Sequence, residues 1–207
     1  MKNKKLRDIV FFIAGVAAVI LINFFASNFY FRLDLTEERR YSMSDATIRM
    51  LENLDEEVYI EVYLSGDLPA GFKRLQKATR DQLESFRAYG GDNVQYKFYD
   101  PSQIKDEKAR NKFYLDLGQK GIQVTNVFAN ENGKKVEKLI LPGALITYRE
   151  KEVAVMLLSG NRSNNPQEIL NQSIENVEFE LASAISNLTQ SKKKRLGFLT
   201  GHNELED

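Results

Sequence analysis

The sequence contains no cysteine and only one histidine, His202. The lack of cysteine excludes disulfide bonds, thiolate metal sites and cysteine nucleophiles, so the fold must be held by its apolar core alone. A single histidine is a poor supply for a histidine-based metal site or a Ser-His-Asp triad. Basic and acidic residues both number 29, so no net charge favours nucleic acid. We expect no catalytic residue, metal or cofactor.

Polar side chains are scarce between residues 9 and 31, where only Asn23, Ser27 and Asn28 interrupt an apolar run. A helix of this length reaches about 34 Å, enough to cross a hydrocarbon core of about 30 Å. We therefore expect a transmembrane helix over residues 9–31, with the three polar side chains facing protein partners. The alternative is a cleaved signal peptide, whose apolar region is usually about 7–15 residues long; Ala26-Ser27 is the feature that suits it.

The charges on either side of this run predict its orientation. Basic residues precede it at four positions, opposed by Asp8, whereas the charges that follow it are of mixed sign. Because basic flanks stay on the cytoplasmic side, residues 1–8 are expected to be cytoplasmic and residues from 32 onward to be exported. The basic residues are Lys2, Lys4, Lys5 and Arg7.

The exported part has the pattern of an α/β domain with a mixed sheet. Residues 32–56 are expected to form a juxtamembrane helical connector, with Ser44 as an N-cap, followed by a domain over residues 57–190. Alternating apolar residues predict strands, and apolar residues spaced by three and four predict helices. The expected strands cover 58–64, 94–99, 122–129, 136–141, 144–148 and 152–158, and the expected helices cover 71–89, 104–119 and 169–188.

This order of elements is also that of the thioredoxin-like fold, with Pro142 before a strand where that fold carries a proline. The loop after the first strand, residues 65–70, has no C-x-x-C, so we expect no redox chemistry. A further strand is expected at 196–200 with no helix after it. We therefore expect residues 191–207 to begin a βα unit that is truncated in this chain.

Two loops and one histidine are candidate sites. Ser65, Gly66 and Asp67 follow the first expected strand, and Asp100 follows the second, at positions where α/β folds often bind ligands. Ordinary turns are the favoured interpretation, because the spacing of a phosphate-binding loop is absent. His202 could act as a base with Glu204 nearby, but no nucleophile is supplied beside it.

Several motifs resemble the GldG family, the gliding-motility-associated auxiliary components of ABC transporters in Bacteroidetes-type bacteria. They are RLDLTEERRYSMS at 32–44, VYIEVYLSGDLP at 58–69, YDP at 99–101 and FLTGH at 198–202. The resemblance implies an inner-membrane protein with a periplasmic domain, partnered by an ABC permease and its cytoplasmic ATPase. It implies no active-site residue, and the family is longer than this chain.

Three functional hypotheses follow. The first is a non-catalytic membrane-anchored accessory subunit of an ABC transporter linked to gliding motility or secretion, in a homo- or hetero-oligomer. The second is a periplasmic glycan- or peptide-binding module that uses the loops at 65–70 and 100–103. The third and weakest is a hydrolase built on His202 and Glu204.

Overall fold

The computed structural model describes residues 2–28, 43–131, 134–159 and 165–190. The chain divides after Ser42 into two compact units. The first contains one helix, α1 (Lys2–Asn28). Within the described residues, no helix meets the requirements of length and apolarity for crossing a membrane. The membrane helix expected over residues 9–31 is therefore not confirmed, and its last three residues lie outside the described ranges.

The second unit is built on a four-stranded mixed sheet in the order β2-β1-β5-β6. β1 pairs in parallel with β2 and antiparallel with β5, which in turn pairs antiparallel with β6. These strands are β1 (Val58–Val62), β2 (Val94–Phe98), β5 (Gly143–Tyr148) and β6 (Lys151–Met156). The mixed-sheet α/β class expected from the sequence is confirmed.

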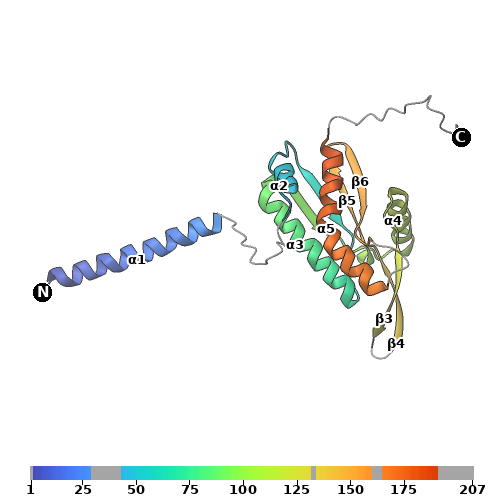
Figure 1. Cartoon of the computed structure of the whole chain (residues 1–207). Helices are drawn as coiled ribbons and strands as arrows, with labels where there is room; N and C mark the ends of the chain where they lie inside the picture. Colours follow the sequence, from blue (N-terminus) through green and yellow to red (C-terminus); the bar gives the residue numbers. More distant parts are fainter. Residues whose placement is uncertain (1, 29–42, 132–133, 160–164, 191–207) are drawn as a thin grey trace, which may run out of the picture. The chain divides into compact units, whose positions relative to one another are not determined.

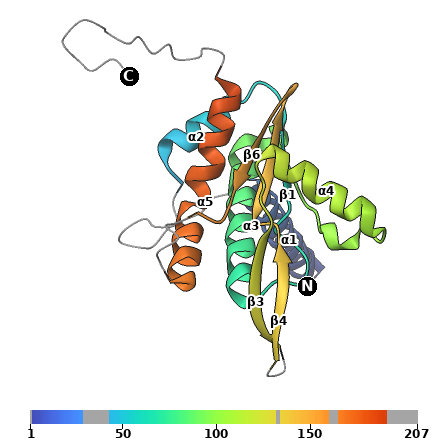
Figure 2. The same ribbon diagram turned by 90° about the vertical axis from the view of Figure 1, so that its right-hand side faces the viewer.

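One face of the sheet is covered by α3 (Ala70–Gly90) and α5 (Pro166–Thr189), which lie side by side in Figures 1 and 2. Between them and the sheet lies the main apolar core, where Ile60 and Ile146 sit opposite each other in the register of β1 and β5. The short helix α2 (Asp45–Glu52) packs against α3 and contributes Leu51 to this core. α2 was expected in a connector over residues 32–56, but the compact unit already begins at Met43.

The opposite face of the sheet carries α4 (Glu107–Lys120) and a smaller core (Figure 2). Leu145, which alternates with Ile146 along β5, points into this second core. A separate two-stranded hairpin of β3 (Thr125–Glu131) and β4 (Lys134–Ile140) follows α4 and projects beyond the sheet. Short 3-10 turns occupy Gly91–Asn93 and Pro101–Gln103.

Some element boundaries differ from expectation for local reasons. β1 stops at Val62 rather than 64, because the Ser65 N–H turns back to the Tyr63 carbonyl at 2.8 Å. α4 begins at Glu107 rather than 104, because the Asp106 carboxylate caps it by accepting from the N–H groups of Lys108 and Ala109. The strand expected at 196–200 and the βα unit at 191–207 lie outside the described residues.

We predict that Ile146→Ala lowers the free energy of unfolding by about 2–5 kcal/mol, because it removes methylenes from a site with no exposed surface. Urea denaturation measures the change. Leu115→Ala is the control: this leucine is 68% exposed on α4, so its loss should change the same quantity by less than about 0.5 kcal/mol. Equal effects of the two substitutions would contradict the described core.

Candidate functional site

A cleft of about 200 Å³ lies where the loops after β1 and β2 meet. The two strands are parallel, so their carboxyl ends reach the same edge of the sheet and bring residues 65–70 beside Asp100. α4 and β4 supply the opposite side of the cleft. The lining residues are Tyr63, Ser65, Asp67, Leu68, Asp100, Pro101, Ser102, Tyr114, Val124, Lys138, Leu139 and Leu141.

Gly66 holds the two loops in close contact. Its φ of 95° lies in a region that side-chain-bearing residues rarely adopt. A Cβ placed on it would lie 2.8 Å from Oδ1 of Asp100. The same Oδ1 accepts a hydrogen bond from the Ser102 N–H at 2.9 Å, which fixes the carboxylate at the mouth of the second loop. Only glycine fits this position without displacing Asp100.

An ion pair crosses the cleft from β4 to the first loop. The Lys138 ammonium donates to Oδ2 of Asp67 at 2.5 Å. This hydrogen bond, with the charge of Lys138, holds the pKa of Asp67 below its ordinary value. The Asp67 side chain is 79% exposed, so the pair adds little stability and serves mainly to orient the loop toward the hairpin.

Aromatic rings form the floor beneath these polar groups. Tyr63 makes edge contacts with Tyr99 and Phe113, at ring-centroid distances of 6.2 and 5.7 Å. Its hydroxyl donates to Oε2 of Glu61 at 3.1 Å, and burial followed by the nearby Glu61 charge raises the pKa of Tyr63. Tyr63 therefore stays protonated at neutral pH and acts as a packed wall rather than as a base.

The lining of the cleft offers several side chains that can form hydrogen bonds. Its titratable side chains are two aspartates, one lysine and two tyrosines, without a nucleophile–base pair. In the described part of the chain, no group of three or more His, Asp or Glu side chains could hold a metal ion. A polar ligand, hydrogen-bonded by Ser65, Ser102 and the aspartates, fits this composition.

Four of the residues singled out in the sequence come together at this cleft: Ser65, Gly66 and Asp67 on the loop after β1, and Asp100 beside them on the loop after β2. The remaining ones lie on the other unit or outside the described side chains. Asn23 is exposed on α1, and the side chains of Ser27 and Asn28 lie outside the described ones, as does His202 with its neighbours.

The sequence analysis did not identify Lys138 and Tyr114 as residues of this cleft. Alternation along β4 could have placed Lys138 on one face, but not its pairing with a residue 71 positions away.

The model of the family described as "Domain of unknown function (DUF7088)" matches residues 37–147, more than half of the chain. The chain belongs to the DUF7088 family. An uncharacterized protein of Borreliella burgdorferi is 23% identical over all 207 residues. The chain spans about a third of that relative's length, at 36%. No solved structure matches the chain.

The DUF7088 match contains every lining residue of the cleft but stops inside β5. The described domain continues beyond it through β6 and α5, whose Leu181 and Ile185 have no exposed surface in the main core.

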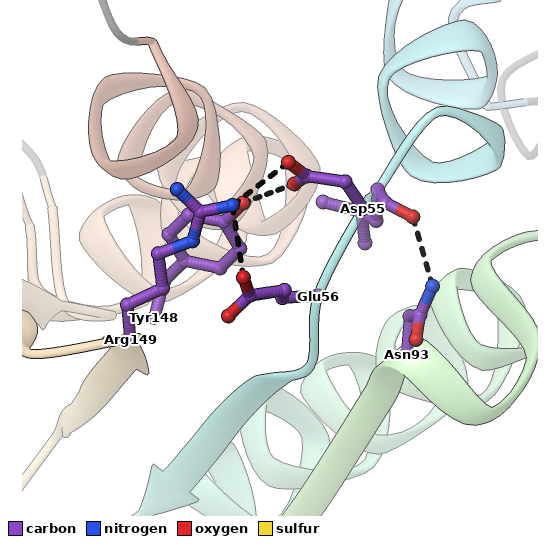
Figure 3. Close-up of polar contacts among 6 residues, drawn as sticks. Asp55, Glu56, Asn93, Tyr148 and Arg149 are labelled. Carbon is purple, nitrogen blue, oxygen red and sulfur yellow. Dashed lines mark hydrogen bonds and ion pairs between the residues drawn. The ribbon is translucent and has the colours of Figure 1, made fainter.

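A second polar cluster lies at the other end of β1, where Val58 pairs with Tyr148 (Figure 3). The Tyr148 hydroxyl donates to Oδ1 of Asp55, and the Arg149 guanidinium lies 2.8 Å from Oδ2 of Asp55 and 3.0 Å from Glu56. Arg149 has a φ of 55°, so the turn between β5 and β6 aims its side chain at these acids. The cluster fastens the loop before β1 to that turn.

The Tyr148 hydrogen bond is the main cause that lowers the pKa of Asp55, with smaller support from Arg149. When the pKa of a carboxyl is lower in the folded state, its charge stabilises the fold at every pH above the unfolded-state pKa of about 3.9. This stabilisation is lost as the pH falls through the folded-state pKa.

We predict that Asp55→Asn lowers the free energy of unfolding at about pH 6 and that this difference from the unsubstituted protein shrinks as the pH falls below about 4. Urea denaturation across this pH range measures the change in the free energy of unfolding. Asp116→Asn, on the exposed surface of α4, is the control, and a pH-independent cost for Asp55→Asn would contradict the role of the charge.

Proposed function

We propose that this protein is a non-catalytic accessory subunit of an ABC transporter complex, anchored by its N-terminal helix in the inner membrane with the DUF7088 domain in the periplasm. The observation that supports this most directly is the exposure of large apolar side chains on α1 between Val10 and Leu21. A helix that is apolar all round needs apolar surroundings, which lipid or permease helices would supply. These side chains are Val10, Phe11, Phe12, Ile13, Val16, Val19, Ile20 and Leu21.

The flanking charges and the motifs of the sequence support the same proposal. Lys4 and Arg7 are exposed at the start of α1, as a cytoplasmic flank requires. The GldG-like motifs suggest a permease and a cytoplasmic ATPase as partners, and gliding motility or secretion as the process. The cleft, without a nucleophile–base pair, suits a subunit that binds rather than reacts.

We further propose that the domain has a thioredoxin-like fold that lacks redox chemistry. The sheet order β2-β1-β5-β6, with α3 and α5 on one face and α4 on the other, supports this. Pro142 directly precedes β5, and its carbonyl accepts from the Leu157 N–H at 2.7 Å. The loop before α3, residues 65–70, contains no C-x-x-C.

The test is affinity purification of the full chain from membranes in mild detergent, followed by mass spectrometry. We predict recovery of a permease and an ATPase at near-equal amounts. A variant in which residues 9–28 are scrambled at the same composition keeps the apolar content of the helix but changes which side chains share a face. It should lose the permease, because the specific contact surface is removed. Recovery of the protein alone, under conditions that keep another transporter intact, would refute the proposal.

The cleft favours a second candidate, a glycan- or peptide-binding module. A ligand at 100 times its dissociation constant stabilises a protein by about 2.7 kcal/mol, which raises the melting temperature measurably. We predict that one member of a panel of cell-envelope glycans and short peptides raises it, and that Asp100→Ala abolishes the rise while Asp116→Ala does not. A panel without effect, or a rise that survives Asp100→Ala, would count against this site.

A further inference from the structure

A wider groove of about 720 Å³ runs between α2 and α5, on elements that do not line the cleft. Figure 2 shows α2 beside α5. The groove is open along its length and has an apolar floor flanked by polar side chains. The lining residues are Ser44, Ala46, Thr47, Met50, Glu175, Glu178, Phe179, Ala182, Ser183, Ser186 and Asn187.

Hydrogen bonds to Glu178 fix the spacing of the two helices. Its Oε1 accepts from the Ser44 N–H at 2.9 Å and from the Thr47 hydroxyl at 2.8 Å, at the first turn of α2. A carboxylate is favourable at that position, where unpaired N–H groups concentrate. The groove is therefore held at fixed width by a contact inside the domain and does not depend on an occupant.

Phe179 is the exposed apolar residue of this groove. It is 68% exposed, although α5 buries a complete stripe on its other side through Val177 and Leu181. Phe179 thus makes no contribution to the core, and Met50 and Ala182 continue its apolar surface across the groove. Exposed aromatic side chains in a concave surface are typical anchors of protein interfaces.

The charged side chains that line the groove have one sign. They are Glu175 and Glu178, and no basic residue among the described ones joins them in the lining. Over its whole length α5 carries glutamate at four positions and neither lysine nor arginine. The side chain of Glu175 is exposed, so its charge faces solvent or a partner. An apolar surface bordered by carboxylates complements a segment with apolar residues on one face and basic residues at its edge.

We propose that the α2–α5 groove is a docking site for a basic amphipathic helix of a partner protein. The apolar face of that helix packs on Phe179, Met50 and Ala182, and its lysine or arginine side chains pair with Glu175. The site is separate from the cleft, and it does not rest on the membrane anchor or on the transporter assignment.

The test uses the full chain in non-ionic detergent and a fluorescein-labelled synthetic helix of about 18 residues, with leucine spaced by three and four and lysine at the edges. A matched peptide carries glutamate in place of lysine. Fluorescence anisotropy measures binding of each peptide, with detergent alone as the blank. We expect the lysine peptide to bind, to weaken as salt rises, and to bind at least about tenfold tighter than the glutamate peptide.

Variants locate the binding. Phe179→Ala should weaken it at least about tenfold without lowering the melting temperature, because the ring is outside the core. Glu175→Lys should weaken it and reduce its dependence on salt. Leu115→Ala, equally exposed at 68% but on α4, should leave it within about twofold.

Three results would overturn the proposal: equal binding of both peptides, binding that survives Phe179→Ala, or no binding of either. Self-association of the full chain that Phe179→Ala abolishes, without peptide binding, would assign the groove to a second copy instead.

Discussion

The antiparallel pairing of β1 with β5 determines where both ends of the sheet place their polar groups. At one end the register sets Val58 opposite Tyr148, and this brings the Tyr148 hydroxyl to Asp55. At the other end it sets Val62 opposite Ala144, and the Tyr63 N–H continues the ladder to the Gly143 carbonyl. The loop that follows β1 is thereby held against Asp100. A shift by one residue would turn Ile60 and Ile146 out of the main core, so the apolar pattern protects the geometry of the cleft.

Local patterns predicted the elements well where one face is buried. Val58, Ile60 and Val62 alternate and lie in the main core, as do Leu170, Val177 and Leu181 along α5. Prediction was poorer where a single side chain decides the boundary, as with the cap at Asp106. The sequence also placed Ser65, Gly66, Asp67 and Asp100 at strand ends, and parallel pairing then brought them together. It could not identify Lys138, because a hairpin's position relative to the sheet depends on packing between distant segments and not on periodicity. The sequence shows Phe179 as one more apolar residue of a helix. Its exposure in the structure distinguishes it from the apolar residues of α5 that lie in the core.

The two concave surfaces of the domain differ in what they can recognise. The cleft is small and mixes carboxylates, hydroxyls and an ammonium over aromatic rings, which suits a compact polar ligand held by directed hydrogen bonds. The α2–α5 groove is more than three times larger by volume, open, and bordered by carboxylates. Such a surface gains most of its energy from burying an aromatic anchor and gains selectivity from charge. The two surfaces share no lining residue.

On the proposed membrane anchor, weak contacts by these surfaces would be sufficient. Tethering two proteins to one complex raises the effective concentration of their contacts to about the millimolar range for short linkers, so each contact can be weak on its own. A groove with one aromatic anchor and few charges is consistent with that regime. The exposed apolar side chains of α1 and the two concave surfaces of the domain are compatible with the proposed arrangement. In that arrangement the helix would supply localisation, and the domain would supply selection among partners that are already close by.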